Sequence, residues 1–244
     1  MQLDRIIAVR NSKTVFCDED RCIKVFNSGY SKTDILREAL NLAYAEEAGL
    51  NVPKLLEVTT VNGKPALVSK YIEGKSVLRL MKEKPERKEG YLSLFVDAQL
   101  EIQKKSCSLP TSFKSSLSNR ICSAGLSAPI RKELLLSLES LPEENALCHG
   151  DFYPSNVIIG NDGTPFIIDW SHAANGSPIA DALQTFLLLF LRDGQKIAEY
   201  YLDLFCEKSN IKKENFDKWL PVVAAAQYAK SKEEERELLF PFIK

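Results

Sequence analysis

Three polar residues in HGDFYPSNVIIGNDGTPFIID, residues 149–169, have the types and spacing needed for metal-assisted chemistry at an oxygen atom. Asp151 precedes a short apolar run, Asn156 begins that run, and Asp169 ends the next one. Amide and carboxylate oxygens are ligands that suit Mg²⁺. The spacing therefore predicts a magnesium site at Asn156 and Asp169, with Asp151 able to reach a substrate hydroxyl beside the metal.

A β-hairpin would bring the two metal ligands together. The runs NVII and PFIID flank residues 160–164, where Asp162-Gly163 is a strong signal for a two-residue turn. Such a turn sets Asn156 opposite Asp169, with Cβ atoms about 4.5–5.5 Å apart, whereas a bulge in the turn would shift the register. The structural alternative is that Asn156 and Asp169 cap strand ends while Asp151 forms a turn.

The elements that must position these residues fall into two regions, and the first is rich in strands. TVFC and CIKVF flank the polar turn at 18–21, and KLLEVTTV and KPALVSKYI flank Asn62-Gly63, so two hairpins are expected. Between them, apolar residues recur at helical spacing from about Thr33 to Glu47, and Gly49 ends that helix. Residues 1–73 are thus predicted to form a small sheet with one helix against it.

The second region, residues 74–244, is predicted to be mainly helical. Amphipathic spacing marks helices around 91–102 and 197–205, and IADALQTFLLLFL is apolar on nearly all sides, as in a helix buried in the core. Ser231 with Glu234 fits a capping box that opens a last helix. The fold class is therefore α+β, with a strand-rich first part and a helical second part.

Composition argues against several classes of protein. The 244 residues carry a formal charge of -1, so charge gives no reason to expect nucleic acid or an acidic membrane as partner. The longest strongly apolar stretch, 186–191, is too short to span a bilayer, and charges interrupt the N-terminus, unlike a secretory signal. The six cysteines form no C-x-x-C pair, which argues against zinc and favours free thiols. We expect a cytoplasmic protein, and the oligomeric state stays open.

HGDFYPSN followed by IIDW resembles the catalytic loop and metal-binding segment of protein-kinase-like phosphotransferases, above all the aminoglycoside phosphotransferase and choline kinase family. The resemblance implies a two-lobe fold, with residues 1–73 as a nucleotide-binding N-lobe and 74–244 as a C-lobe that holds the catalytic loop, the metal site and the acceptor. It implies that Asp151 orients or deprotonates the acceptor hydroxyl while Asn156 and Asp169 hold Mg²⁺. The phosphoryl donor is then ATP, with GTP as the alternative.

The same family uses a strand lysine for the nucleotide phosphates and a helix glutamate that holds this lysine. CIKVF supplies Lys24, where an unpaired ammonium among apolar neighbours would be costly, and the following helix supplies Glu38. The alternatives are a surface lysine and a solvated glutamate, and Glu46 and Glu47 compete with Glu38 as the partner.

Two further nucleotide contacts follow from the resemblance alone. Lys70, Tyr71 and Ile72 resemble the hinge whose backbone groups would bind adenine. The segment VRNSKTVF has no glycine where protein kinases have several, so Ser12 and its neighbouring amides are expected to contact the phosphates instead.

Three residues near the catalytic loop are given supporting roles. By resemblance, His149 is a structural hub of the loop, and Asp181 braces the loop from a helix N-terminus. A plain capping role accounts equally well for Asp181, because the helix dipole favours a carboxylate there. His172, the second histidine of the chain, is a weaker candidate for lining the site.

The acceptor is expected to be a small molecule with a hydroxyl group. Only eleven residues separate Asp169 from Asp181, and the A-P-E motif of a peptide platform is absent. An aminoglycoside would want carboxylates such as those of KEEERE, a choline-like acceptor would want an aromatic cage, and another metabolite is equally open. The cage candidates are Tyr200, Tyr201, Trp219 and Tyr228.

Two other functions make different demands on the sequence. A catalytically idle kinase-like module that regulates through nucleotide binding would lack at least one key residue, yet all four are present: Lys24, Asp151, Asn156 and Asp169. A metal-dependent hydrolase built on His149 would need more histidine ligands than His172 alone supplies.

Overall fold

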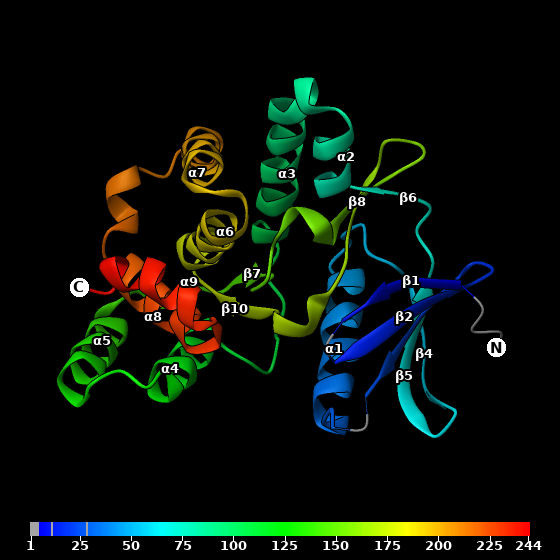
Figure 1. Cartoon of the computed structure of the whole chain (residues 1–244), viewed down its shortest axis with the longest axis horizontal. Coiled ribbons are helices and arrows are strands. Elements are labelled where there is room, and N and C mark those ends of the chain that lie inside the picture. Colours follow the sequence, from blue (N-terminus) through cyan, green and yellow to red (C-terminus); the bar gives the residue numbers. More distant parts are fainter. Residues whose placement is uncertain (1–4, 11, 28) are drawn as a thin grey trace. The chain divides into compact units, whose positions relative to one another are not determined.

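The computed structural model describes residues 5–10, 12–27 and 29–244, and Figure 1 shows the order of the elements. The chain divides into two compact units: Met1–Glu86 with Pro154–His172, and Arg87–Tyr153 with Ala173–Lys244. The predicted α+β class, with a small antiparallel sheet first and helices after it, is confirmed. The units differ from the expected division at residue 73, and the assignment of 1–73 and 74–244 as functional lobes stays a prediction.

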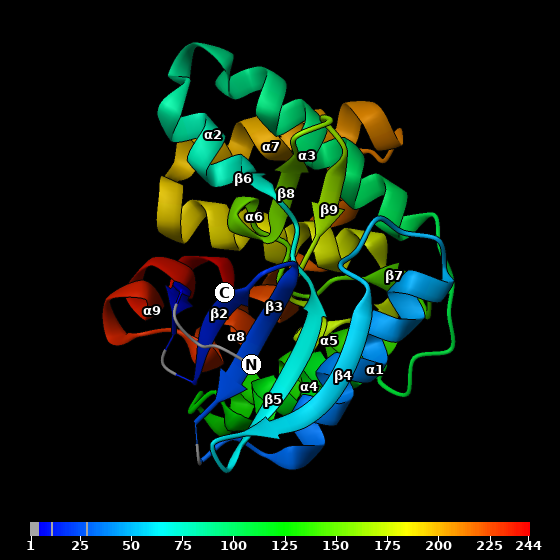
Figure 2. The same cartoon turned by 90° about the vertical axis from the view of Figure 1, so that its right-hand side faces the viewer.

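The first unit contains a five-stranded antiparallel sheet in the order β1-β2-β3-β5-β4, and Figure 2 shows its strands side by side. Both predicted hairpins are present. Asp18 pairs with Arg21, and Val61 pairs with Lys64 around Asn62-Gly63, whose positive φ angles suit the tight turn. The strands are β1 (Arg5–Val9), β2 (Lys13–Asp18), β3 (Arg21–Phe26), β4 (Leu55–Val61) and β5 (Lys64–Lys70).

The predicted helix forms as α1 (Lys32–Glu47), between β3 and β4. The Ser31 side chain accepts a hydrogen bond from the Thr33 N–H at its start, and Gly49 follows its end with φ 75°. Its buried side chains recur at helical spacing and include Ile35, Glu38 and Leu42.

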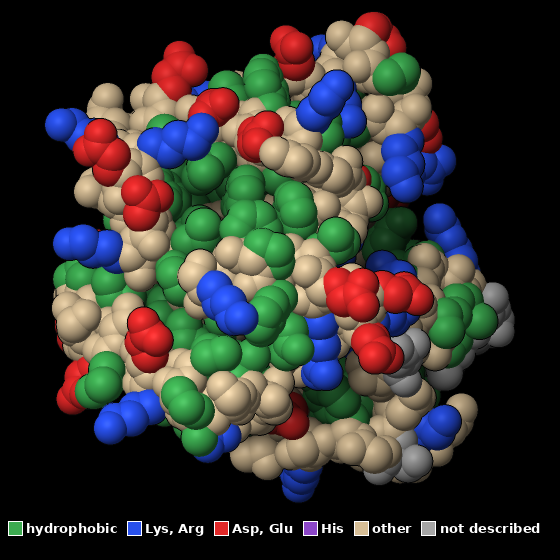
Figure 3. All heavy atoms as spheres, turned by 60° about the vertical axis from the view of Figure 1, so that its left-hand side comes forward, with side chains coloured by type: hydrophobic (Ala, Val, Ile, Leu, Met, Phe, Trp, Pro, Cys, Tyr) green, Lys and Arg blue, Asp and Glu red, His purple; other side chains and the backbone are tan. Residues whose placement is uncertain are grey.

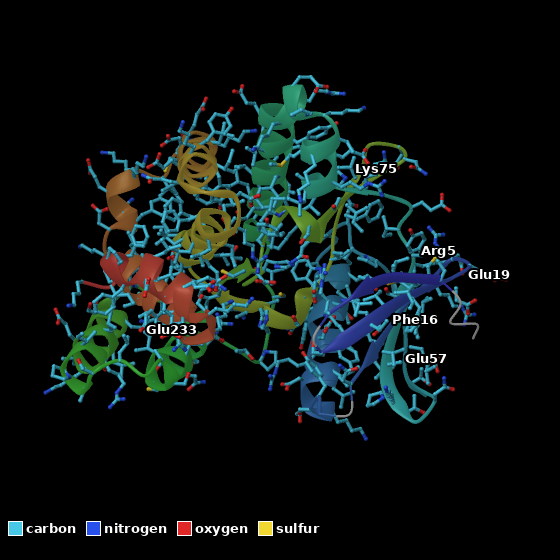
Figure 4. The ribbon with its side chains drawn as sticks, in the orientation of Figure 1. Arg5, Phe16, Glu19, Glu57, Lys75 and Glu233 are labelled. Atoms are coloured by element: carbon cyan, nitrogen blue, oxygen red, sulfur yellow. The ribbon has the colours of Figure 1, made fainter. Side chains whose placement is uncertain are left out.

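The two faces of the sheet have different contents. Side chains that lie opposite each other in an antiparallel pair share a face, so Val15, Lys24 and Leu67 lie on one side. The other side carries a small apolar cluster of Ile23, Val25, Ala66 and Val68, with Phe16 (labelled in Figure 4) against it.

Residues 154–172 join the first unit because they pair with its chain. The strand β6 (Gly74–Ser76) pairs with β8 (Val157–Gly160), which pairs with β9 (Pro165–Ile167), and α2 (Val77–Glu83) follows β6. The Ile167 N–H donates to the Asn51 carbonyl (2.9 Å), and Asn41 Nδ2 donates to the Trp170 carbonyl (2.9 Å). Short 3₁₀ turns flank this hairpin: η2 (Pro154–Asn156) and η3 (Trp170–His172).

The predicted register of this hairpin is wrong by one residue. Val157 pairs with Ile167 and Ile159 with Pro165, so Asn156 meets Ile168, whose N–H donates to the Asn156 carbonyl (2.9 Å). The cause is the turn: the Gly160 N–H donates to the Thr164 carbonyl across three residues, with Gly163 at φ 88°. Asp162 favours this loop because its carboxylate accepts the Thr164 N–H (2.9 Å).

The second unit is mainly helical. Its two-stranded sheet pairs β7 (Ala146–Cys148) with β10 (Ala174–Gly176). The apolar segment predicted to be buried is the centre of α6 (Pro178–Asp193), where residues 180–189 are all buried. The other helices are η1 (Pro85–Arg87) at the junction, α3 (Lys88–Gln103), α4 (Phe113–Ser123), α5 (Ala128–Ser140), α7 (Gln195–Ser209), η4 (Lys213–Phe216), α8 (Leu220–Lys230), α9 (Glu233–Leu239) and η5 (Phe240–Phe242).

The start of α9 corrects a second prediction. The N-cap is Lys232, whose N–H donates to Glu235 Oε2 (3.1 Å), so the cap lies one residue later than the expected Ser231–Glu234 box. Ser231 is buried and accepts a hydrogen bond from Gln227 (3.3 Å), which occupies the hydroxyl.

All six cysteines are free thiols, as expected. Within the described part of the chain, no helix combines the length and the hydropathy needed to cross a bilayer.

Candidate active site

The expected ion pair between Lys24 and Glu38 is present in the first unit. Lys24 Nζ lies 2.6 Å from Glu38 Oε1, and only 2% of the glutamate side chain is exposed. Glu38 is therefore the partner rather than Glu46, whose carboxylate instead accepts the Leu55 N–H (3.2 Å). The role of this pair in nucleotide binding stays a prediction.

A second lysine that sequence reasoning missed joins the pair. Lys13 Nζ lies 2.9 Å from Asp169 Oδ1 and 3.7 Å from Glu38 Oε2, while Lys24 Nζ lies 3.6 Å from the same Asp169 oxygen. Two cations and two carboxylates thus form one cluster, with three of the four side chains at most 14% exposed. The missed signal was strand alternation, because Lys13 lies two residues from Val15, the strand partner of Lys24.

The cluster keeps its lysine charged. Burial by itself lowers the pKa of Lys24, but the carboxylates of Asp169 and Glu38 outweigh that cost and raise the pKa above its usual value. The hydrogen bond to Glu38 adds to the effect. Lys24 therefore remains an ammonium at neutral pH, as phosphate binding requires.

Asn156 and Asp169 have the donor chemistry for Mg²⁺. Asp169 adopts φ 68°, a conformation rare outside glycine, asparagine and aspartate, and its side chain is 27% exposed. Asn156 Oδ1 accepts a hydrogen bond from Ser155 Oγ (3.3 Å) at the end of η2. One carboxylate and one amide oxygen fit a cation that keeps water and takes substrate phosphates as its remaining ligands. Among the residues that the structure describes, no three His, Cys, Asp or Glu side chains group together so that they could hold a metal by themselves.

The loop that carries Asp151 belongs to the second unit and is held by α6. Gly150 adopts φ 73°, its N–H donates to Asp181 Oδ1 (2.9 Å), and its carbonyl accepts from Gln184 Nε2 (2.6 Å). Asp181 also accepts hydrogen bonds from Gln99 (2.9 Å) and Gln103 (3.0 Å). Its carboxylate thus reaches the loop, which matches the expected brace rather than a simple helix cap.

His149 lies at the centre of the same loop. The ring is fully buried, its Nδ1 accepts the Asp151 N–H (3.3 Å), and its edge meets the Phe152 ring at 5.6 Å. These contacts are those of the structural hub implied by the family resemblance. His172, by contrast, is exposed on η3 in the first unit.

Replacing Asp181 by Ala is expected to lower the free energy of unfolding by at least about 3 kcal/mol. The change leaves the Gly150 N–H and the two glutamine amides without their acceptor, and each buried unsatisfied group costs about 1–3 kcal/mol. Urea unfolding measures the loss. The matched control is Asp203→Ala, which removes an exposed ion pair and should cost about 1 kcal/mol or less. Equal losses in the two variants would refute the brace.

The hinge segment differs in part from expectation. The Lys70 N–H donates to the Lys54 carbonyl (2.8 Å), the Tyr71 N–H donates to the Asp20 carbonyl (2.7 Å), and Lys70 Nζ forms an ion pair with Asp20. These two amides are therefore already used within the protein. The Ile72 amide and the backbone carbonyls of this segment remain as expected contacts, and adenine binding here stays a prediction.

The turn that was expected to contact the phosphates is described in part. The Arg10 N–H donates to the Lys13 carbonyl (2.9 Å), and the Ser12 carbonyl accepts the Asn27 N–H (2.9 Å). Asn11, one of the neighbours whose amide was invoked, lies outside the described residues. The phosphate contact of Ser12 stays a prediction.

Three of the four aromatic residues that are candidates for a cage already make other contacts within the protein. Tyr201 and Trp219 are buried, and the Tyr201 hydroxyl donates to Gln99 Oε1 (2.5 Å), so both residues serve packing. The ring of Tyr228 is already covered by the Arg236 guanidinium at 5.1 Å. Tyr200 is half-buried on α7.

Comparison with known proteins bears on this arrangement. Residues 123–221 match the phosphotransferase enzyme family (APH). No curated protein sequence matches the chain. A thermostable mutant of the aminoglycoside phosphotransferase APH(4)-Ia has a similar structure, with a TM-score of 0.66 at 14% identity over 98% of this chain and 89% of that chain.

Other solved structures agree. The choline kinase LicA from Streptococcus pneumoniae gives a TM-score of 0.67 at 14% identity, covering 100% of this chain and 93% of its own. The ADP-bound aminoglycoside phosphotransferase APH(2'')-Ib gives 0.63 at 17% identity, covering 98% and 90%. At such identities the likeness establishes the fold. The resemblance inferred from residues 149–170 is thus confirmed: the chain matches the phosphotransferase enzyme family over residues 123–221 and has the protein-kinase-like fold of aminoglycoside phosphotransferases and choline kinases.

Proposed function

We propose that the chain is an ATP-dependent phosphotransferase that moves the γ-phosphate of a nucleotide to the hydroxyl of a small molecule. The observation that carries the proposal is the cluster of Lys13, Lys24, Glu38 and Asp169, in which the buried Glu38 and the partly exposed Asp169 hold two ammonium groups in place. Preorganised cations beside a metal-binding carboxylate are what phosphoryl transfer requires of a protein.

Each residue has a defined task in this proposal. Lys24, and with it Lys13, binds the nucleotide phosphates, while Asn156 and Asp169 hold Mg²⁺, which neutralises charge on the transferring group when bound. Asp151 accepts the proton of the acceptor hydroxyl and orients that hydroxyl for attack. The loop bonds of Gly150 fix the backbone that carries Asp151.

The donor is a nucleotide. Structures of related fold were determined with ADP, AMP-PNP and AMP, which supports ATP as the donor here, with GTP as the alternative. Those relatives include proteins that bind hygromycin B and a choline kinase, so the acceptor is proposed to be a small molecule.

The test is a panel of hydroxyl compounds scored for ADP release, with ATP and then GTP as donor and with Mg²⁺ present. The expected result is acceptor-dependent ADP release that disappears when Mg²⁺ is chelated. Nucleotide binding with no transfer to any acceptor would favour the second candidate, an idle nucleotide-binding regulator. The presence of all four key residues, with Lys24, Glu38 and Asp169 in contact, argues against that candidate.

Lys24→Met is expected to weaken ATP binding and kcat/KM by about 10- to 150-fold, because a charge-assisted hydrogen bond is worth about 1.5–3 kcal/mol. Lys13→Met should give a loss of the same order if Lys13 also binds phosphate, and a change of less than about twofold if it serves only Glu38 and Asp169. Calorimetric titration with ATP and steady-state kinetics measure both.

The control for both lysines is Lys75→Met. Lys75, labelled in Figure 4, forms an exposed ion pair with Glu83 and should leave nucleotide affinity unchanged. The double variant Lys13→Met/Lys24→Met adds a measurement of the free energy of unfolding. Either lysine alone leaves Glu38 one ammonium partner, whereas losing both leaves two carboxylates together, so the combined loss of stability should exceed the sum of the single losses.

A further inference from the structure

Three cationic side chains of the second unit contact the loop around Asp151 or act on one another. Arg120 comes from α4, Arg192 from α6 and Lys230 from the end of α8, and α8 packs against both other helices. Several other lysines of this unit pair with carboxylates, as Lys208 does with Asp97. The charges that act on Lys230 are instead the two arginines and Asp151.

Arg120 is tied to the catalytic loop through one glutamine. Its Nη1 donates to Gln184 Oε1 (3.4 Å), and the same glutamine donates its Nε2 to the carbonyl of Gly150, the residue before Asp151. Burial lowers the pKa of Arg120 and the Asp151 carboxylate opposes that shift, so the two groups interact electrostatically. The guanidinium is thus a neighbour of the proposed catalytic carboxylate.

Arg192 is placed by the residues that follow the loop. Its guanidinium carbon lies 4.5 Å from the centroid of the Tyr153 ring, and the Tyr153 hydroxyl donates to Asp193 Oδ2 (2.7 Å). Stacking on the ring holds the guanidinium while leaving its N–H donors available along its edge. An arginine held this way is suited to bidentate binding of a carboxylate or phosphate.

Lys230 is the most telling of the three. Its side chain reaches solvent, yet burial around the ammonium and repulsion from Arg120 and Arg192 lower its pKa to about 8, with Asp151 opposing the shift. Like charges are costly to gather unless an anion joins them. Asp151 alone does not balance three cations, and Asp193 is already engaged by Tyr153.

We propose that Arg120, Arg192 and Lys230 bind a carboxylate or phosphate group of the acceptor, so that the substrate is an anionic hydroxyl compound. This inference rests on the proposed function, because it names the class of acceptor for the hydroxyl that Asp151 would activate. A polycationic acceptor would be repelled by the same three side chains.

The carboxylates near the end of the chain lie together at the start of one short helix. Figure 4 labels Glu233 at the start of α9, and Glu233, Glu234 and Glu235 all lie in its first turn, where the helix dipole favours negative charge. Glu235 is used by the N-cap amide of Lys232. On the face drawn in Figure 3, acidic and basic side chains both occur.

The test compares acceptors that carry an anionic group with uncharged analogues of the same carbon skeleton, using wild-type protein, ATP and Mg²⁺. The matched pairs are glycerate with glycerol, gluconate with sorbitol, pantothenate with panthenol, and glycerol 3-phosphate with glycerol; choline and kanamycin represent cations. The expected result is a kcat/KM at least about 10-fold higher for the anionic member of the pairs that react. The carboxylate and phosphate pairs distinguish the two possible anionic groups.

Variants separate acceptor binding from other roles. Lys230→Met should raise KM for the anionic acceptor about 10-fold with little change in kcat, and Lys230→Glu should reverse the preference between anionic and neutral members. The control is Lys132→Met, an exposed lysine on α5. Folding is checked by thermal unfolding at pH 7. A lysine with a lowered pKa destabilises the folded state below that pKa, so Lys230→Met should not lower the melting temperature.

The pH profile gives an independent readout. Lys230 loses its proton as the pH rises through about 8, so kcat/KM for an anionic acceptor should fall above pH 8 while that for its neutral partner does not. The charged groups that act on Lys230 are Arg120, Arg192 and Asp151. The fall should vanish in Lys230→Met.

Each outcome of the acceptor panel and of the Lys230→Met variant either supports or overturns the anionic class of acceptor. A preference for neutral or cationic acceptors overturns the anionic class and leaves the phosphotransferase proposal intact. An equal loss of kcat with every acceptor in Lys230→Met also overturns it, and assigns the three cations to the transferring phosphoryl group. Nucleotide binding with no transfer to any compound of the panel overturns the proposed function and this inference together.

Discussion

Asp151→Asn should lower kcat for phosphoryl transfer by about 10²–10⁴-fold, the usual contribution of a positioned general base, while the Kd for ATP in the presence of Mg²⁺ changes less than about twofold. The substitution keeps the volume and removes the ability to accept a proton. The backbone should hold its place, because the Gly150 amide and carbonyl remain bound to Asp181 and Gln184. Acceptor-dependent ADP release and calorimetric ATP titration measure the two quantities separately.

The split between kcat and Kd is what makes this prediction specific. A loop that collapsed would lose stability as well as activity, and circular dichroism during thermal unfolding would reveal it. Asp203→Asn, on an exposed helix face of the same unit, is the matched control and should leave kcat unchanged. Full turnover in Asp151→Asn would reject the assignment of the catalytic base.

Asp169→Asn should abolish most of the Mg²⁺ dependence of nucleotide binding, with affinity for ATP in Mg²⁺ falling about 100-fold or more. A ligand carboxylate that holds the metal on the phosphates contributes several kcal/mol. The substitution also removes a negative charge that contacts Lys13 (2.9 Å) and Lys24 (3.6 Å). Binding of metal-free ATP should therefore stay equal or become tighter, since less negative charge faces the phosphates.

A lower affinity for ATP with Mg²⁺, together with an equal or higher affinity without it, distinguishes a metal ligand from an aspartate that only supports the structure. Loss of affinity with and without Mg²⁺ would show that Asp169 only supports the lysines. The neighbouring carboxylate provides a control: Asp162→Asn changes the hairpin turn, where Asp162 binds Thr164, and should leave nucleotide affinity within about twofold.

Asp169→Asn has a consequence for stability at alkaline pH. The folded-state pKa of Lys24 is raised chiefly by Asp169 and Glu38 against the cost of burial, so its stabilising effect is present below the unfolded pKa and lost as the pH rises through the folded value. Removing Asp169 weakens that effect. The variant should unfold at a lower alkaline pH than wild type.

Local signals in the sequence were enough for most elements of the first unit. Asn62-Gly63 specifies a tight turn because both residues accept positive φ, and the hairpin forms there. Helical periodicity from 33 to 47 gives α1, with Glu38 on its buried face. A lysine among apolar strand residues needs a partner, and Glu38 at 2.6 Å is that partner. Each of these inferences uses residues of a single helix, strand or turn, or of two that follow each other in the sequence.

Short-range reasoning failed where one residue of register mattered. Asp162-Gly163 predicted a two-residue turn, but the carboxylate of Asp162 caps Thr164 and makes a longer loop, so Asn156 meets Ile168 rather than Asp169. In a hairpin a shift of one residue sends a side chain to the opposite face. The length of such a turn depends on side-chain hydrogen bonds, and the residue types alone do not predict which of these bonds will form.

What the sequence determined by itself is therefore the class of fold, the resemblance of residues 149–169 to the phosphotransferase family and the Lys24–Glu38 pair. Only the tertiary structure joined Lys13 to Asp169, 156 positions later, and brought Arg120 and Lys230, from two different helices, within electrostatic reach of Asp151. Periodicity and turn signals act over a few residues. Contacts between distant segments depend instead on how whole elements pack, and that packing determines which charges meet.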